Sequence, residues 1–336
     1  MSPWWCALRA ALRVYVAGAL VALAQLLRRC FGGFSEPAFP PQPGRVAIVT
    51  GGTDGIGYAT ARRLARLGMH VILAGNNEHK AQDVVRRMKE ETRNPQVEFL
   101  YCDLACMRSI RDFVQHFRRK ALPLHVLVNN AGVMMVPQRS TRDGFEEHFG
   151  LNYLGHFLLT NLLLDVLKAS GCAGRCARVV SVSSATHYVG HMDMADLQGR
   201  RGYSAHGAYA QSKLALVLFT YRLQALLDAQ GCAVTANAAD PGVVDTGLYQ
   251  HVFWGCGRLQ RLAAPWLFKT PEEGSWTSVF AAVSPRLEGR GGRYLYNERE
   301  TRSVAASYDT RLQQQLWATS CRLTGLRDTT RPLTPE

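Results

Sequence analysis

A tyrosine and a lysine four residues apart form the pair in this chain that is best suited to chemistry. Tyr209 and Lys213 fall in a stretch, 209–230, whose spacing predicts a helix, so their side chains share one face. A free phenol has a pKa of about 10, but a nearby ammonium favours the phenolate and lowers that value. Tyr209 could then act as a general base in alcohol oxidation or a general acid in carbonyl reduction. Alone, such a pair is more often a surface tyrosine beside a solvated lysine.

A pair of serines could hold a substrate beside that tyrosine. Ser184 follows a predicted strand over 178–182, and ligands bind at the carboxyl edge of parallel sheets. Its hydroxyl could donate a hydrogen bond to the substrate oxygen. The adjacent Ser183 is the rival for this role.

A glycine-rich turn separates a predicted strand over 45–50 from a predicted helix over 58–67. Its sequence is Thr50-Gly51-Gly52-Thr53-Asp54-Gly55-Ile56-Gly57. Glycines allow a tight turn and a close approach to a pyrophosphate, while the helix N-terminus supplies unpaired N–H groups. This context favours dinucleotide binding over a purely structural turn.

Short apolar runs alternate with helical patterns from Arg45 onward. Strands are expected over 45–50, 70–74, 97–101, 125–129, 178–182 and 234–239, and helices over 58–67, 79–92, 107–120, 144–168 and 209–230. This alternation predicts an α/β fold, a single Rossmann-type doubly wound parallel sheet with helices on both faces. The expected divisions are a membrane-associating segment (1–30), a linker (31–44), the catalytic domain (45–300) and a C-terminal tail (301–336).

Together, these motifs resemble the short-chain dehydrogenase/reductase family over about residues 45–297. The glycine turn, Asn129-Asn130-Ala131-Gly132, the two serines, Tyr209-Ala210-Gln211-Ser212-Lys213 and Pro241-Gly242 occur in the family's order. The stretches 182–187 and 212–215 resemble its retinol-dehydrogenase-like branch. That branch carries an insertion before the tyrosine, so the 25-residue separation of Ser184 and Tyr209 (209 − 184) still favours Ser184 over Ser183.

The resemblance implies an NAD(P)-dependent alcohol dehydrogenase or carbonyl reductase with four catalytic residues: Asn152, Ser184, Tyr209 and Lys213. For Asn152, a proton relay from the lysine and a bond to the helix backbone are both open roles. The implied cofactor-binding residues are Gly51, Thr53, Asp54, Gly55, Ile56, Gly57, Asn76, Asp103, Asn130, Gly132, Tyr209, Lys213 and Thr246. In the family, the position of Asp103 lies near the adenine and that of Thr246 meets the nicotinamide carboxamide. No metal site is expected.

The choice between NAD and NADP depends on the residues after the second strand. An acidic side chain there would hold the ribose hydroxyls of NAD, and a basic one would favour NADP. This chain has Asn76, which can bond either ribose form, whereas many relatives carry arginine. Asp54 argues mildly against a phosphate, so NAD, NADP or both remain open.

The N-terminal residues 4–27 are mostly apolar and are followed directly by Arg28 and Arg29. A cleaved signal peptide, and so a secreted protein, is one interpretation, with Ala22-Leu23-Ala24 as the cleavage site. The two arginines better suit retention on the cytosolic side of a membrane, such as the endoplasmic reticulum or a lipid droplet. An anchor that spans once or lies at the interface is therefore expected. The alternative is a helix packed on the protein's own domain.

The net charge of +13 bears on the class of binding partner, and the nine cysteines bear on the redox state of the compartment. The basic residues are scattered without nucleic-acid motifs, so the charge fits a dinucleotide and an anionic membrane surface better than a nucleic acid. An odd number of dispersed cysteines fits free thiols in a reducing compartment. A homodimer is left open.

In the family, the region that corresponds to 248–268 is the substrate lid, so the resemblance implies a lid here, with core packing as the alternative. Its apolar residues are Leu248, Tyr249, Val252, Phe253, Trp254, Leu259, Leu262, Trp266, Leu267 and Phe268. With the anchor, it favours a lipid alcohol or aldehyde: a retinoid, a polyprenol- or dolichol-type isoprenoid, or a steroid. An NAD(P)-binding scaffold at membranes is the alternative function.

Overall fold

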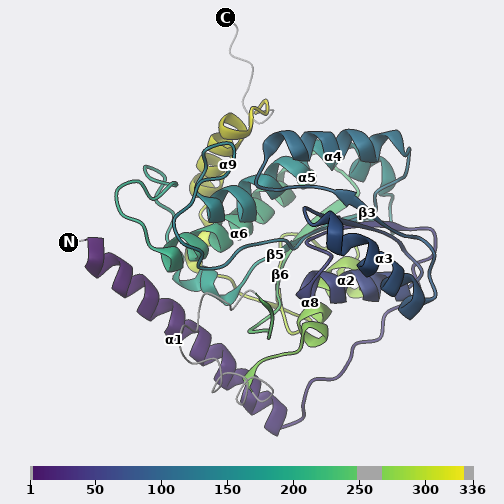
Figure 1. The fold of residues 1–336 in the computed structure, drawn as a ribbon, viewed down its shortest axis with the longest axis horizontal. Coiled ribbons are helices and arrows are strands. Elements are labelled where there is room, and N and C mark those ends of the chain that lie inside the picture. The colour runs from purple at the N-terminus through teal and green to yellow at the C-terminus, as the bar shows by residue number, and fades with distance from the viewer. Residues whose placement is uncertain (1–2, 248–266, 329–336) are drawn as a thin grey trace, which may run out of the picture.

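An eight-stranded sheet forms the centre of the computed structural model, which describes residues 3–247 and 267–328 (Figure 1). The strand order is β3-β2-β1-β4-β5-β6-β7-β8. The strands are β1 (Val46–Thr50), β2 (His70–Gly75), β3 (Val97–Tyr101), β4 (Val126–Asn129), β5 (Ala177–Val182), β6 (Val234–Asp240), β7 (Tyr294–Tyr296) and β8 (Arg299–Thr301). β1 lies between β2 and β4, which is the switch point where ligands bind in doubly wound sheets.

The predicted doubly wound sheet is confirmed, with its six expected strands each within one residue of their bounds. Strands β1 and β4 are buried along their whole length, as apolar strands covered on both faces must be. The structure adds two strands at one edge. β7 continues the parallel order beside β6, whereas β8 pairs with β7 in the antiparallel direction.

Helices cover both faces of the sheet and enclose two separate hydrophobic cores (Figure 1). One core lies under α2 (Gly55–Arg66), α3 (Glu78–Thr92) and α8 (Pro271–Val283). The other lies under α4 (Met107–Arg119), α5 (His156–Ser170), α6 (Ala205–Ala229) and α9 (Thr310–Thr324). Short 3-10 turns are η2 (Ala185–Val189), η4 (Pro285–Leu287) and η5 (Ala305–Tyr308).

The single helix expected over 144–168 is two different helices. A π-helix, η1 (His148–Gly155), runs directly into α5. Such wide turns are rare and often occur at functional sites, and this one contains Asn152. α6 also begins earlier than expected, because Ser204 caps it by accepting a hydrogen bond from the Gly207 N–H at 3.3 Å.

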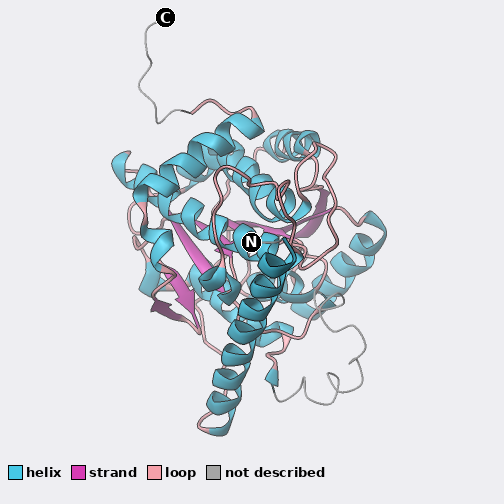
Figure 2. Ribbon diagram, turned by 90° about the vertical axis from the view of Figure 1, so that its left-hand side faces the viewer, coloured by secondary structure: helices cyan, strands magenta, loops and turns pink. Residues whose placement is uncertain are grey.

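The N-terminal helix α1 (Pro3–Cys30) lies across the outside of the domain, where it contacts η2 and α6 (Figure 2). Within the described residues, Ala7–Cys30 is the stretch long and apolar enough to cross a membrane, and only 11% of its most apolar window is buried. The tail expected from residue 301 contains α9, whose Trp317 ring lies 5.0 Å from that of Phe157. That helix is therefore part of the core.

Candidate active site

A cavity of about 1100 Å³ opens at the carboxyl edge of the sheet. Every residue expected to bind the cofactor lines it: Gly51, Thr53, Asp54, Gly55, Ile56, Gly57, Asn76, Asp103, Asn130, Gly132, Tyr209, Lys213 and Thr246. Ser184 lines it too, whereas Asn152 lies behind the wall. The structure thus brings together residues from seven separate segments of the sequence, because parallel strands end at one edge.

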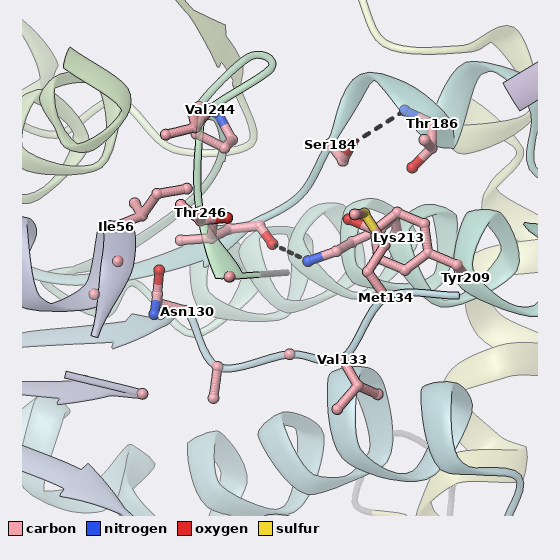
Figure 3. A pocket seen from close by; sticks show the side chains of 18 of the residues that line it. Ile56, Asn130, Val133, Met134, Ser184, Thr186, Tyr209, Lys213, Val244 and Thr246 are labelled. Carbon is pink, nitrogen blue, oxygen red and sulfur yellow. Dashed lines mark hydrogen bonds between the residues drawn. The ribbon is translucent and has the colours of Figure 1, made fainter. Parts of the chain in front are cut away.

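Tyr209 and Lys213 share one face of α6, as their spacing predicts, and each is only 5% exposed. The Lys213 Nζ lies 5.7 Å from the centre of the Tyr209 ring. It also donates a hydrogen bond to the Val182 carbonyl at 2.9 Å, which fixes the ammonium at the end of β5. Figure 3 shows Ser184, Tyr209 and Lys213 grouped together, with Val244 and Thr246 to their left.

The electrostatics of the pair differ from the simple expectation that the ammonium lowers the tyrosine pKa. Burial raises the pKa of Tyr209 well above its usual value, and a hydrogen bond with Ser184 offsets this only in part. Burial also lowers the pKa of Lys213 to about 8, against a smaller opposing effect of Asp240. In the protein alone, desolvation therefore outweighs the attraction between phenolate and ammonium.

The two serines have different partners, and these separate their roles. The Ser183 hydroxyl is buried and donates to the Lys213 backbone carbonyl at 3.1 Å. The Ser184 hydroxyl accepts a hydrogen bond from the Thr186 N–H at 3.3 Å, which caps η2, and it also forms a hydrogen bond with Tyr209 beside the cavity. This arrangement supports Ser184 as the residue that meets a substrate.

Asn152 forms a bracket for the loop that follows β4. Its Oδ1 accepts from the Val133 N–H at 2.8 Å, and its Nδ2 donates to the Val133 carbonyl and to the Ser212 Oγ, both at 3.0 Å. The side chain therefore holds the backbone of this loop and a hydroxyl on α6, and the bond to helix backbone expected for it is not among its contacts with the described residues. The other role, a proton relay, stays a prediction.

Two residues that the sequence analysis did not select, Thr50 and His156, connect the main motifs. The buried His156 donates through Nδ1 to the Asn152 carbonyl at 2.8 Å, so its Nε2 accepts from the Thr50 hydroxyl at 2.9 Å. Burial lowers the pKa of His156 to about 4, which is consistent with this neutral form. The Thr50 oxygen in turn accepts from the N–H groups of Asn130 and Ala131 at 2.8 and 3.0 Å.

The glycine turn has a backbone shape that lets a pyrophosphate approach it closely. Asp54 caps α2 by accepting from the Gly55 N–H at 2.7 Å, and the helix N-terminus faces the cavity. A Cβ on Gly57 would lie 2.1 Å from the Gly51 carbonyl oxygen, so only glycine fits there. A Cβ on Gly132 would lie 3.2 Å from the Asn152 Oδ1. These features fit a dinucleotide pyrophosphate.

The far end of the cavity contains Asn76, directly after β2, and Asp103, after β3. Asn76 is exposed and offers an amide to a ribose. Lys80 forms a hydrogen bond from Nζ to Asp54 Oδ2 at 2.6 Å, and this bond lowers the pKa of Asp54. A cation is thus present beside Asp54, which lines the cavity, although the residue after the strand is neutral.

The outer wall is apolar and partly comes from α1, which sequence reasoning did not assign to the site. Val14, Tyr15, Gly18, Ala19 and Ala22 line the cavity. Leu267 and Phe268, from the expected lid, line it as well. The remaining lid residues, from Leu248 to Trp266, lie outside the described residues.

Comparisons with known proteins agree with this site. A family model described as short chain dehydrogenase matches residues 45–254. A polyprenol dehydrogenase of Homo sapiens is 69% identical over 330 residues, covering 98% of this chain and 100% of the relative. Retinol dehydrogenase 13 of Mus musculus is 40% identical over 325 residues, covering 94% of both. These matches confirm the resemblance to the retinol-dehydrogenase-like branch. They also show that the chain is similar to polyprenol dehydrogenase over almost its whole length.

Solved structures are also similar to this chain in fold and in sequence. An uncharacterized protein of Mycobacterium Paratuberculosis is 33% identical, with a TM-score of 0.70, and the match covers 87% of this chain and 99% of that one. A structure from Beutenbergia cavernae with bound NADP is 25% identical, with a TM-score of 0.61, covering 76% and 96%. The chain therefore belongs to the short-chain dehydrogenase/reductase family.

Proposed function

We propose that this protein is an NAD(P)-dependent oxidoreductase that interconverts a lipid alcohol, of the isoprenoid type, and its aldehyde or ketone. The observation that carries the proposal is the grouping of Ser184 with the buried Tyr209 and Lys213 at the carboxyl edge of the sheet, facing a large cavity with an apolar outer wall. The cavity is wide enough for a dinucleotide and part of a long substrate.

Ser184, Tyr209 and Lys213 have different roles in the proposed reaction. When bound, the oxidised nicotinamide would supply the acceptor for the hydride that leaves the substrate carbon in the oxidative direction. Tyr209 takes the hydroxyl proton, and Ser184 orients the same oxygen. Lys213, held by the Val182 carbonyl, supplies positive charge beside the phenol. Burial keeps the pKa of Tyr209 high and so opposes formation of the phenolate. The positive charge of an oxidised nicotinamide in the same cavity would favour the phenolate, in the same direction as the Lys213 ammonium.

The relatives' names and the cavity wall support a lipid substrate. Relatives named polyprenol dehydrogenase and retinol dehydrogenase both indicate isoprenoid alcohols. Val14, Ala19, Ala22 and Leu267 give the outer wall an apolar surface that suits such a chain better than a sugar. A steroid is the alternative substrate. An NAD(P)-binding scaffold is less favoured, because Asn152, Ser184, Tyr209 and Lys213 are all in place.

We further propose that α1 associates with a membrane. Its exposed apolar side chains include Trp4, Trp5, Leu8, Leu12, Val16, Leu20, Leu23 and Leu27. Because other residues of the same helix pack on the domain, an interfacial position suits it better than a full span. The endoplasmic reticulum or a lipid droplet, with the catalytic domain facing the cytosol, remains the expected location. A homodimer remains open.

A substitution at the catalytic tyrosine tests the enzyme against the scaffold. Retinol, a polyprenol, a dolichol and a steroid alcohol, with the matching aldehydes or ketones, are incubated with NAD(H) or NADP(H). The wild type should turn over at least one isoprenoid, and Tyr209→Phe should reduce that rate at least about a hundredfold while retaining cofactor binding. Turnover unchanged by Tyr209→Phe would refute the catalytic assignment. Cofactor binding without turnover of any substrate would favour the scaffold.

A further inference from the structure

The N-terminal helix carries one buried amide, and it makes all of its hydrogen bonds to the catalytic domain. Gln25 is 1% exposed, in a helix that is otherwise largely exposed and apolar. Its Oε1 accepts from the Val243 N–H at 2.8 Å, and its Nε2 donates to the carbonyls of Val243 and Leu267 at 3.0 and 3.1 Å. Burial of an amide is unfavourable unless it is bonded, so these three bonds determine where the helix can dock.

The loop that receives Gln25 belongs to the cofactor pocket. Pro241, Gly242, Val243 and Val244 line the cavity directly after β6, and Thr246 follows them. The backbone of this loop pairs with Lys269, since the Lys269 N–H donates to the Val243 carbonyl and the Asp245 N–H to the Lys269 carbonyl, both at 2.9 Å. Gln25 adds the Val243 N–H and Leu267 carbonyl to this pairing.

The loop is shaped to admit the amide. Gly242 has a φ of +82°, and a Cβ there would lie 2.4 Å from the Gln25 Oε1. One helical turn after Gln25, Arg29 donates to the Phe268 carbonyl at 2.9 Å and pairs with Glu273 at 2.7 Å. A second contact holds the same side of the loop to α1.

At the other end of the docked face, α1 contacts the catalytic group. Val14 is buried in a cluster with Met134, Met135, Tyr209 and Ala210. Val14 and Gln25 lie 11 residues apart, or about 16 Å along the helix axis, so α1 bridges the mouth of the cavity.

We propose that Gln25 is a positioning residue for the nicotinamide-side loop, so that the N-terminal helix is a working part of the active site as well as an anchor. This inference rests on the proposed function only for its cofactor. Gln25 holds 241–244 in the conformation in which Thr246 faces the cavity. Without its bonds, the loop retains the Lys269 pairing but loses the partners of the Val243 N–H and the Leu267 carbonyl.

The test is Gln25→Met in the full-length protein, which removes all three hydrogen bonds at nearly constant volume. The dissociation constants of NADH and NADPH, measured by fluorescence, should rise at least about fivefold, whereas binding to phospholipid vesicles should not weaken. With any alcohol that is turned over, the KM for the cofactor should rise as well. Because cofactor binding needs no lipid substrate, an incorrect substrate class would leave this readout intact.

The matched control is Leu23→Met, on the exposed side of the same helix, which should leave both dissociation constants unchanged. A folded Gln25→Met with dissociation constants within about twofold of the wild type would overturn the proposal. A lower melting temperature with unchanged cofactor affinity would show a structural role only, and would overturn it too. If Gln25→Met does not fold, Gln25→Glu, which keeps the acceptor and loses both donors, decides by the same criterion.

Discussion

Lys213, which we propose acts with Tyr209, lies where burial of its charge lowers the stability of the fold. The residue is 5% exposed, and burial lowers its pKa from 10.5 to about 8. Below pH 8 the folded protein must hold a desolvated charge, which destabilises it. The motif spacing predicted this residue and its helix face, but not its burial, which depends on α6 packing against the end of β5.

The first prediction follows from that burial. Lys213→Met should abolish oxidoreductase activity and raise the free energy of unfolding at pH 7 by about 1–3 kcal/mol. Between pH 8 and 10.5 the unfolded wild type binds more protons than the folded one, so wild-type stability rises with pH. The advantage of the variant should therefore shrink over that range in urea unfolding experiments. An advantage independent of pH would contradict the assignment.

Asn76 carries the second prediction, on the choice of cofactor. An aspartate there would accept hydrogen bonds from the ribose of NAD and repel the 2′-phosphate of NADP. Asn76→Asp should thus shift the ratio of kcat/KM values about tenfold or more towards NAD. Asn77→Asp is the matched control, because it adds the same charge while keeping an oxygen that can accept from the Lys80 N–H as the cap of α3. An equal shift in both variants would show only a general charge effect.

At the scale of elements, the hydrophobic pattern predicted six strands and the helices between them, since five-residue apolar runs and long amphipathic segments are strong signals. It missed β7 and β8, which have three residues each, too few for a recognisable period. It also merged η1 with α5, because a π-helix has no sequence signature comparable to the 3.6-residue period.

The network of Thr50, His156 and Asn152 joins three of those elements, and the sequence gives no local sign of it. Thr50→Val, a change of similar shape, would leave the N–H groups of Asn130 and Ala131 without their acceptor. We expect a loss of about 1–3 kcal/mol in the free energy of unfolding and a higher KM for the cofactor. The control is Thr92→Val at the end of α3, where the hydroxyl donates to its own helix at 2.7 Å. Equal effects of both changes on the cofactor KM would contradict the network's role.

At the scale of the whole molecule, the sequence predicted one catalytic domain preceded by an apolar segment. For that segment, a membrane anchor and a helix packed on the domain were both consistent with the sequence. The structure combines features of both, since Gln25 and Val14 are buried while the opposite side is exposed. The docking could not be predicted, because Gln25 and Val243 lie 218 residues apart and meet only in the fold.

That division of α1 into two sides leads to the last prediction. Leu20 and Leu23 are 63% and 51% exposed and do not line the cavity. The double variant Leu20→Glu/Leu23→Glu should lose sedimentation with vesicles of phosphatidylcholine and phosphatidylserine, because two buried charges oppose insertion of the apolar side. Cofactor affinity and turnover of a short, soluble isoprenoid alcohol should stay within about twofold of the wild type, since the docked side is unchanged.

Turnover of a long-chain isoprenoid presented in the same vesicles should then fall in proportion to the loss of binding. Tyr101→Glu, an exposed aromatic on the edge strand β3 away from α1, is the matched control and should leave sedimentation unaltered. Sedimentation of the double variant at the wild-type level would show that the exposed side of α1 is not the membrane-binding surface. Loss of turnover on the soluble alcohol as well would instead show that this side of α1 supports the active site, and that the helix does not have two separable functions.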